Sequence, residues 1–340
     1  MVKQFKNYLV SLLKGENLSS SEMEALMTLI MTGELSSAQI ASCIVAMQIK
    51  GETPDEIAAA ATVMREHANK VIVDDYKYLI DTCGTGGDSL QTFNVSTLSA
   101  IIAAAAGAKV AKHGGRSVSS RCGSADVLEA LGVNVNLDHK RLGHLVDTIG
   151  IGFMFAPNYH PAMKYVAPVR KELEIRTMFN LLGPLTNPAS AKRQVVGVYS
   201  KELTITFAKV LQKLGSKHVL VVHGEDGMDE ISITGKTFIA ELKDNVIKEY
   251  AIRPSLFKLN EGSLKDIVVE DSFHSKKMIL DILNGKLSVG RDITLLNAGA
   301  AIYVSGLAND INSGIMIAAD MIDQGKGMEK LNQLITASND

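Results

Sequence analysis

At residues 81–97 the chain reads DTCGTGGDSLQTFNVST, between an apolar run at 78–80 and an alanine-rich run at 98–106. The apolar run is typical of a strand and the alanine-rich run of a helix, so the glycines lie where a strand passes into a helix. Backbone N–H groups of glycine can approach an anion without obstruction from Cβ, and a helix N-terminus adds partial positive charge. The stretch therefore predicts a phosphate site at the carboxyl end of a strand.

Two familiar phosphate loops do not match this stretch. The nucleotide-binding P-loop requires GxxxxGK[ST], and no lysine follows these glycines, while the dinucleotide pattern GxGxxG would need glycine in place of Ser89. Asp88 would repel a phosphate unless it faced ribose hydroxyls or a metal, so we expect a ligand that carries both sugar and phosphate. A tight turn in which Asn94 or Ser96 only caps the helix is the alternative.

The composition limits the class of protein. The chain has 340 residues, of which 46% are hydrophobic and 21% charged, as in a globular protein of two domains. No run approaches the ~18 apolar residues of a membrane span, and the first residues lack a signal-peptide core, so we expect a cytoplasmic protein without a membrane partner. The net charge of −2 argues against a nucleic-acid partner. The three cysteines have neither disulfide-framework nor zinc spacing.

Residues 1–70 have the sequence pattern of helices only. Apolar residues at helical spacing predict a small bundle, in which they pack as a core or seal a subunit interface. Capping-box patterns mark three helix starts. They are Ser19 with Glu22, Ser36 with Gln39, and Thr53 with Glu56 after Pro54 at the first helical position.

From about residue 71, strand and helix patterns alternate. This alternation predicts an α/β domain with a mostly parallel central sheet, whose loops gather at the carboxyl ends of the strands. Helical patterns at 293–304 and 314–322 follow near the end of the chain. The predicted strands are 78–81, 109–112, 133–135, 152–155, 195–199 and 218–222, then a hairpin of 237–242 and 246–251 turned at Asp244-Asn245.

Three further stretches carry groups that could bind an anion or a metal. Residues 112–124, KHGGRSVSSRCGS, combine basic side chains with hydroxyls after a predicted strand, as in an anion clamp or a merely solvated loop. Residues 168–188 place Arg170 and Arg176 beside an apolar segment with Gly-Pro and Asn-Pro breaks, as at a pocket or on a helix surface. Asp229 and Glu230 follow a strand end and suit Mg²⁺, although acidic turns are commonly only solvated.

Together and in this order, these motifs resemble the anthranilate phosphoribosyltransferase family over nearly the whole chain. The matching pieces are GTGGD at 84–88, NVST at 94–97, KHGGRSVSS at 112–120, GSADVLEALG at 123–132, RTMFNLLGPLTNP at 176–188 and GMDEIS at 227–232.

The resemblance implies a fold and an activity. The fold would be nucleoside phosphorylase/phosphoribosyltransferase-like, with a small all-helical domain at 1–70, joined by helices near 160–190, and a larger α/β domain at 71–340 that binds phosphoribosyl pyrophosphate. The activity would be transfer of the phosphoribosyl group from that donor to the amine of anthranilate, in tryptophan biosynthesis. The protein would be a Mg²⁺-dependent homodimer, joined through the helical domain.

The resemblance also implies individual site residues. The metal would be held by Ser96, Asp229 and Glu230. No activated nucleophile is required, because departure of pyrophosphate from C1 of the ribose needs positioning and metal-assisted charge neutralisation. The substrate-binding residues would be Gly84, Gly86, Gly87, Asp88, Thr92, Asn94, Ser96, Thr97, Lys112, His113, Gly115, Ser119, Ser124 and Arg170, with Arg170 and His113 on anthranilate.

Two positions depart from the family pattern, and both concern the acceptor. The family usually has asparagine at Gly115, where we expect a positive φ, and glycine at Glu174, which could tune Arg170. Three classes of function stay open: the anthranilate enzyme, a related enzyme of this fold, and a non-catalytic nucleotide-binding paralogue. The related enzyme would be a phosphoribosyltransferase with another acceptor or a pyrimidine-nucleoside phosphorylase. The intact glycine loop and acidic pair argue against the paralogue.

Overall fold

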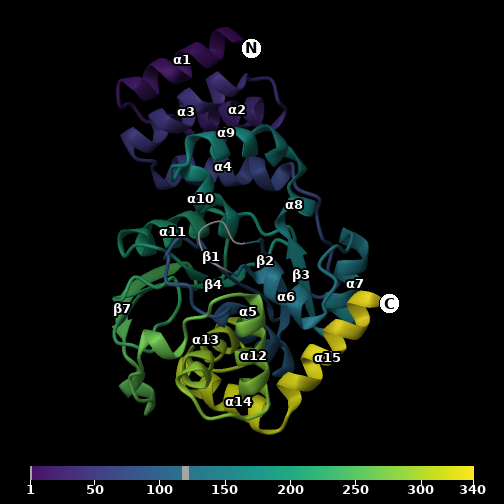
Figure 1. Cartoon of the computed structure of the whole chain (residues 1–340). Helices are drawn as coiled ribbons and strands as arrows, with labels where there is room; N and C mark the ends of the chain where they lie inside the picture. The colour runs from purple at the N-terminus through teal and green to yellow at the C-terminus, as the bar shows by residue number, and fades with distance from the viewer. Residues whose placement is uncertain (1, 117–121) are drawn as a thin grey trace.

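The computed structural model describes residues 2–116 and 122–340. The first four helices form a bundle at one end of the molecule: α1 (Val2–Leu13), α2 (Ser20–Met31), α3 (Ser37–Lys50) and α4 (Pro54–Glu66) (Figure 1). Reciprocal bonds between a side chain and the backbone begin α2, α3 and α4, so the three predicted capping boxes are confirmed.

A seven-stranded sheet forms the centre of the larger part, in the order β3-β2-β1-β4-β5-β6-β7. The neighbours from β3 to β5 run parallel, and β6 and β7 are added antiparallel, which confirms the predicted mostly parallel sheet. Asp244 and Asn245 both have positive φ at the predicted hairpin turn. The strands are β1 (Leu79–Gly84), β2 (Lys109–Gly114), β3 (Ile151–Phe155), β4 (Arg193–Gly197), β5 (His218–Gly224), β6 (Thr237–Lys243) and β7 (Val246–Ile252).

Helices cover both faces of this sheet. Buried residues of α5 (Val95–Ala105) and α13 (Val289–Ser305) share one core with residues of β1, β4 and β5, while α11 (Glu202–Lys213) shares another core with the bundle. No helix in the described part of the chain is long and apolar enough to cross a membrane. The others are α6 (Ser124–Leu131), α7 (His139–Ile149), α8 (Ala156–Tyr159), α9 (Ala167–Leu173), α10 (Met178–Leu182), α12 (Ser272–Leu283), α14 (Ile311–Asp323) and α15 (Lys326–Asn339).

Two short helices from the middle of the chain pack on the N-terminal bundle. α9 contacts α3, and α10 contacts both α3 and α4. Val169 of α9 and Phe179 of α10 are buried in the same core as Ile44 and Met47 of α3. Figure 1 shows α9 among the helices of the bundle and α10 between α4 and the sheet.

The predicted strand at 133–135 is wrong. Val133 and Val135 are buried in the main core, as the apolar pattern suggested. Their segment pairs with no strand, because the Val133 N–H closes the end of α6 and the Asn134 N–H donates to Ser338 Oγ. An extended segment that packs its alternate side chains on a helix layer has the same period as a strand.

Candidate active site

The glycine loop begins where β1 ends, at the carboxyl edge of the sheet, and leads into α5. Gly86 and Gly87 have φ of 64° and 84°, a region that side chains disfavour. A Cβ on Gly84 would lie 2.5 Å from Asp229 Oδ2. Glycine at these positions therefore permits both the turn and the close approach of an acidic side chain.

Asp229 and Glu230 come to this loop from the turn after β5. Asp229 Oδ2 accepts a 2.9 Å hydrogen bond from the Gly86 N–H, and Glu230 Oε1 accepts one of 3.1 Å from the Ser96 N–H at the start of α5. A Cβ on Gly197, the last residue of β4, would lie 1.5 Å from the Asp229 carbonyl oxygen. Three strand ends thus bring the predicted metal residues together.

The charge balance of this cluster favours a bound cation. Burial raises the pKa of Asp229, and the neighbouring Asp88 raises it further. Burial likewise raises the pKa of Glu230, and the charge of Asp229 adds to the effect. A divalent cation between these carboxylates would reverse the effect by stabilising their charged forms.

Lys112, near the end of β2, is the basic residue of this cluster. It is buried, and its ammonium donates to the Thr82 carbonyl oxygen and, over 3.2 Å, to Ser96 Oγ. Burial lowers the pKa of Lys112, while Asp81, Cys83 and the two acids oppose that shift. Lys112 therefore lies within reach of a ligand bound at the glycine loop.

The donor set fits Mg²⁺ only together with a ligand. In the described residues, no group of three or more His, Cys, Asp or Glu side chains is arranged to hold a metal ion. Mg²⁺ is commonly bound by one or two carboxylates, with waters and substrate phosphates as its remaining ligands. Two acids beside a phosphate-type loop match that description.

Asn94 does not act as a simple helix cap. It occupies the N-cap position of α5 without a side-chain capping bond. Its amide donates to the Cys122 carbonyl oxygen over 3.1 Å, and its Oδ1 accepts from Ser275 Oγ over 2.7 Å. Thr97 Oγ1 is buried without a hydrogen-bond partner among the described residues. The capping-only alternative is therefore wrong for Asn94, whose side chain links α5 to two other segments.

His113 is buried at the end of β2. Its Nδ1 lies 3.2 Å from the Gly183 carbonyl oxygen, and its ring centroid lies 5.0 Å from that of His160. Burial, followed by the nearby His160, lowers the pKa of His113 to about 3, so the ring is neutral near pH 7. Because a carbonyl only accepts, Nδ1 carries the hydrogen. Nε2 is then an acceptor, and it has no partner among the described residues.

Arg116 of the predicted anion clamp is paired with acids of the protein itself. Arg116 is paired with Asp126 at 2.8 Å and with Glu129 at 2.6 Å, so it is not available for a substrate anion. Ser124 begins α6 next to Gly114, where a Cβ would lie 3.3 Å from Ser124 Cβ. Ser119 lies outside the described residues.

The expectation of a positive φ at Gly115 is wrong. Its φ lies outside the left-handed region, and a Cβ built on it would meet nothing within 4 Å. Its carbonyl oxygen accepts from the Ala125 N–H over 3.2 Å. A side chain therefore fits at Gly115, and glycine here leaves open space rather than relieving strain.

Arg170 lies on α9, away from the glycine loop in sequence and half-buried. Its guanidinium makes no hydrogen bond or ion pair with any described residue, and burial lowers its pKa. An unpaired, partly desolvated guanidinium matches a ligand carboxylate well, because its planar donors bind both oxygens.

Glu174 ends α9 with a φ of 51°, in the left-handed conformation that glycine adopts most readily. This backbone accounts for the glycine that the family usually has there. The side chain is exposed and forms no ion pair with Arg170 within the described residues. The structure therefore gives no contact through which Glu174 would tune Arg170.

Arg176, which we did not predict as a site residue, holds the glycine loop. Its Nη2 donates to the Gly87 carbonyl oxygen over 2.5 Å, and its guanidinium carbon lies 4.3 Å from the Tyr199 ring centroid. Arg176 is the first residue of the family motif at 176–188, which could have marked it as a site residue. Its contact with Gly87 was not predicted because the two residues are 89 positions apart.

Asp81 and Asn187 form a second contact that the sequence analysis missed. Asn187 Nδ2 donates to Asp81 Oδ2 over 2.7 Å and to the Ala111 carbonyl oxygen over 2.9 Å, and Asp81 Oδ1 accepts from the His113 N–H over 3.0 Å. All of these side chains are buried. The pair positions the ends of β1 and β2 next to each other.

The predicted residues fall into two groups. Thr92 lies between Asp88 and Asn94 in sequence and forms an isolated β-bridge with Val268. His113, Gly115 and Ser124 lie around the end of β2, and the Arg170 side chain forms no hydrogen bond or ion pair with the described residues of either group. The group around the glycine loop is Gly84, Gly86, Gly87, Asp88, Asn94, Ser96, Thr97, Lys112, Asp229 and Glu230.

Comparison with known proteins divides the chain in the same way as the fold. Residues 76–328 match the glycosyl transferase family, a/b domain, and residues 6–68 match the glycosyl transferase family, helical bundle domain.

The relatives that match over almost the whole chain are anthranilate phosphoribosyltransferases. The chain is 54% identical to an anthranilate phosphoribosyltransferase from Methylobacillus flagellatus, over 95% of each chain. It resembles the crystal structure of that enzyme from Thermus thermophilus with a TM-score of 0.93 and 39% identity, over 98% of this chain and 99% of the other. The Saccharomyces cerevisiae enzyme, in complex with PRPP and Mg, superposes with a TM-score of 0.91 at 28% identity over 98% of both chains. Its complex with 4-fluoroanthranilate gives 0.89 at 28% identity, over 98% and 97%.

Proposed function

Since this chain belongs to the anthranilate phosphoribosyltransferase family, we propose that it transfers the phosphoribosyl group of phosphoribosyl pyrophosphate to the amine of anthranilate. The products are N-(5-phosphoribosyl)anthranilate and pyrophosphate, in tryptophan biosynthesis. One observation carries the proposal. Asp229 accepts a hydrogen bond from Gly86 in the glycine loop, 143 positions away, and Glu230 accepts one from Ser96 at the start of α5, 134 positions away.

On the donor side, the glycine loop and the N-terminus of α5 bind the phosphates, and Lys112 and Ser124 add donors. The metal residues are Ser96, Asp229 and Glu230. A bound Mg²⁺ supplies neutralisation of the charge that develops on the leaving pyrophosphate. Support comes from the raised pKa values of both acids, which are caused by burial and by neighbouring carboxylates, Asp88 for Asp229 and Asp229 for Glu230, and from the PRPP and Mg in the yeast relative.

On the acceptor side, Arg170 binds the anthranilate carboxylate. His113 Nε2, an acceptor without a partner among the described residues, orients the amine by accepting one of its N–H groups. The amine nitrogen then forms its bond to C1 of the ribose as the bond from C1 to the pyrophosphate oxygen breaks, and the proton that the nitrogen loses passes to water or to the departing pyrophosphate. The open space at Gly115 leaves the other side of the amine without an amide contact.

We further propose the division into domains and the assembly. Residues 1–70 with the helices near 160–190 form the small domain, supported by the core that they share, and residues 71–340 form the larger one. A homodimer through the helical domain would cover Leu13 and Ile49, which are 71% and 82% exposed. The cytoplasmic location stays a prediction.

One assay tests the function. Purified protein is mixed with phosphoribosyl pyrophosphate, Mg²⁺ and anthranilate, and the loss of anthranilate fluorescence is followed together with pyrophosphate release. We expect both signals, and neither after removal of Mg²⁺ with EDTA. Pyrophosphate release with another aromatic amine, but none with anthranilate, would indicate an altered acceptor. Phosphorolysis of a pyrimidine nucleoside by inorganic phosphate would indicate the phosphorylase instead.

A further inference from the structure

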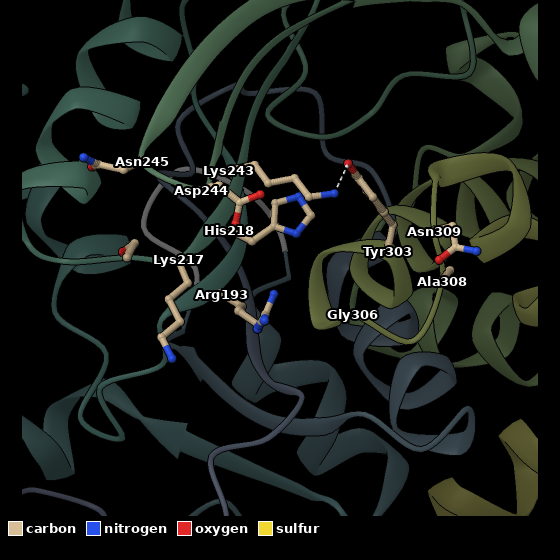
Figure 2. A pocket seen from close by; sticks show the side chains of 11 residues that line it. Arg193, Lys217, His218, Lys243, Asp244, Asn245, Tyr303, Gly306, Ala308 and Asn309 are labelled. Atoms are coloured by element: carbon tan, nitrogen blue, oxygen red, sulfur yellow. Dashed lines mark hydrogen bonds between the residues drawn. The ribbon is translucent and has the colours of Figure 1, made fainter.

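A cavity lies at the edge of the sheet opposite the candidate active site. It has a volume of about 520 Å³ and is bounded by the starts of β4 and β5, the turn between β6 and β7, and the segment after α13 (Figure 2). β4 runs from this cavity to Gly197 at the active-site edge. Five residues of strand separate the two sites by about 13 Å, so a ligand here would not touch the glycine loop.

Three basic side chains line this cavity. Arg193 uses one N–H to reach the Val304 carbonyl oxygen, over 3.1 Å, and makes no other hydrogen bond among the described residues. The Lys217 ammonium has no hydrogen-bond or ion-pair partner in the same set. Lys243 donates to Tyr303 Oη over 3.1 Å (Figure 2). Asp244 is the one acid among the lining residues, so the cavity is net positive.

The half-buried Glu241 does not tie up these lysines. Glu241 accepts hydrogen bonds from His218 at 2.9 Å, Tyr303 at 2.7 Å and Tyr250 at 3.0 Å. These three donors occupy its carboxylate, although His218 and Tyr303 also line the cavity. The network fixes the Tyr303 hydroxyl and, through it, the position of the Lys243 ammonium.

Neutral donors complete the lining. The hydroxyl of Ser216 is buried and has no hydrogen-bond partner among the described residues. The side-chain amides of Asn245 and Asn309 likewise form no hydrogen bond within the described part of the chain. A buried donor normally has a partner in the protein or in an ordered water, whereas the exposed amides of Asn245 and Asn309 are open to solvent, so the Ser216 hydroxyl is the donor that a ligand would satisfy. Charged and neutral donors that the fold leaves unused here point to an acceptor-rich partner.

We propose that this cavity is a second anion site, which binds the phosphate group of a small molecule. A guanidinium, two ammonium groups and neutral N–H and O–H donors match the several acceptor oxygens and the charge of a phosphate. The cavity is partly open to solvent, and its volume lies in the range of small-ligand sites. The site is independent of the proposed catalytic function, because no residue of the catalytic machinery lines it.

Calorimetric titration with inorganic phosphate tests this proposal. The variant K217A/K243A removes two cavity charges, and K209A/K286A removes two exposed lysines elsewhere with the same change in net charge. Phosphate binding at the active site is common to all three proteins. We expect K217A/K243A to lose one class of phosphate sites, or to bind there at least about tenfold more weakly. The control should match wild type, and the transferase activity of both variants should be unchanged.

Crystals soaked in tungstate, an anomalously scattering phosphate analogue, locate the site directly. We expect a peak within hydrogen-bond distance of Arg193, Lys217 or Lys243. The proposal is overturned if the titrations of wild type and K217A/K243A coincide, or if tungstate occupies only the glycine loop. Loss of transferase activity bears on the proposed function alone, so the two failures are distinguishable.

Discussion

Asp229 Oδ2 lies 2.9 Å from the backbone nitrogen of Gly86 and accepts its hydrogen, which ties the turn after β5 to the loop after β1. The contact leaves the second carboxylate oxygen of Asp229 for other partners, beside Glu230 and Asp88. A cation and a phosphate ligand would therefore meet where these two loops touch.

Removing the charge of either acid should impair Mg²⁺-dependent turnover. We expect Asp229→Asn and Glu230→Gln each to lower turnover by ~10²-fold or more, because they weaken metal binding without removing volume from the core. Turnover measured against Mg²⁺ concentration should show partial rescue at high Mg²⁺. Glu225→Gln is the matched control, since Glu225 lies on the same turn but is exposed and paired with Lys236. Full activity of both acid variants at limiting Mg²⁺ would show that Asp229 and Glu230 do not bind the metal.

Arg170→Ala should affect the acceptor alone. Loss of a charge-assisted bidentate pair costs ~2–4 kcal/mol, so we expect the KM for anthranilate to rise, or turnover to fall, by ~30- to 1000-fold. The KM for phosphoribosyl pyrophosphate should hardly change. Lys171→Ala, at the next position and exposed, serves as the control. Equal losses for both substrates would point to a collapsed site and remove Arg170 from its proposed role.

Gly115→Asn should fold normally, because the backbone is not left-handed and a Cβ meets nothing within 4 Å. The added amide can form one hydrogen bond at the acceptor, so we expect a change of about 1 kcal/mol, roughly fivefold, in anthranilate affinity. Gly115→Ala adds only the Cβ and should leave that affinity unchanged. Kinetics with both substrates check this. A wild-type protein inert toward anthranilate, made active by Gly115→Asn, would show instead that the glycine marks a different acceptor.

Glu174→Gly should stabilise the protein. A residue other than glycine in the left-handed conformation lowers the free energy of unfolding by roughly 1 kcal/mol or more. Glycine removes this strain but has a larger entropy in the unfolded chain, so we expect a net gain of about 0.5–1 kcal/mol. The midpoint of urea unfolding should rise accordingly. Glu172→Gly, inside α9, should lower the free energy of unfolding by about 1 kcal/mol. We expect an unchanged KM for anthranilate, and a tenfold change would reveal a contact between Glu174 and Arg170.

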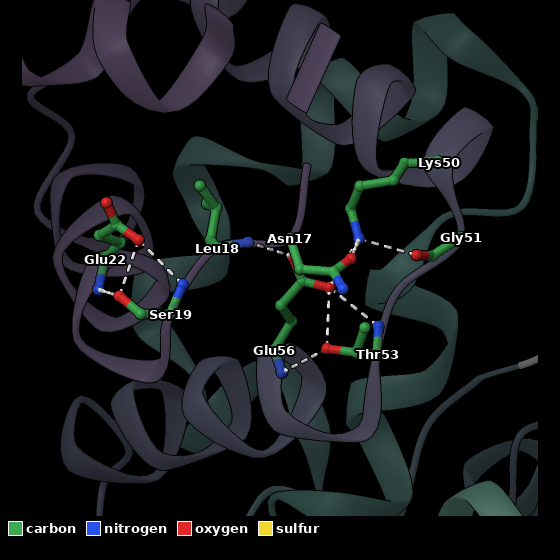
Figure 3. A network of polar contacts seen from close by, with 8 residues as sticks. All are labelled: Asn17, Leu18, Ser19, Glu22, Lys50, Gly51, Thr53 and Glu56. Atoms are coloured by element: carbon green, nitrogen blue, oxygen red, sulfur yellow. Dashed lines mark hydrogen bonds and ion pairs between the residues drawn. The ribbon is translucent and has the colours of Figure 1, made fainter. Parts of the chain in front are cut away.

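Glu56 should make the stability of the helical bundle depend on acid pH. Its buried carboxylate accepts from the Leu18 N–H at 2.9 Å, the Thr53 N–H at 2.9 Å and Lys50 Nζ at 2.8 Å (Figure 3). Burial by itself raises its pKa, but the bonds from Lys50, Thr53 and Leu18 outweigh burial, and the net pKa is lowered from 4.5. The folded pKa is below the unfolded one, so this stabilisation is full above pH 4.5 and is lost as the pH falls through the folded pKa.

Glu56→Gln measures that contribution. Breaking a buried ion pair by removing one partner costs about 3–5 kcal/mol, so we expect a clearly lower unfolding midpoint at pH 7. The difference from wild type should shrink as the pH falls below 4.5. Glu22→Gln changes the exposed capping box of α2, where the effect should be much smaller. A difference between wild type and Glu56→Gln that is the same at pH 7 and pH 3 would contradict the proposed ion pair.

Features that depend on neighbouring residues could be predicted before the fold was known. Capping boxes, the Asp244-Asn245 turn and the glycine loop are each set by backbone conformations and hydrogen bonds within a few positions. The period of apolar residues likewise predicted the helices and most strands. It failed at 133–135, because an extended segment against a helix layer has the same period as a strand.

Contacts between distant residues could not be predicted in this way, because they depend on how the whole chain packs. The bond from Arg176 to Gly87 spans 89 positions and that from Asn187 to Asp81 spans 106. Such contacts depend on strand order and on where α9 and α10 pack, which are properties of the whole core rather than of any local pattern. The surroundings of a side chain also decide its role: Arg116 is a surface group paired with Asp126, whereas Arg170 is half-buried and has no partner among the described residues.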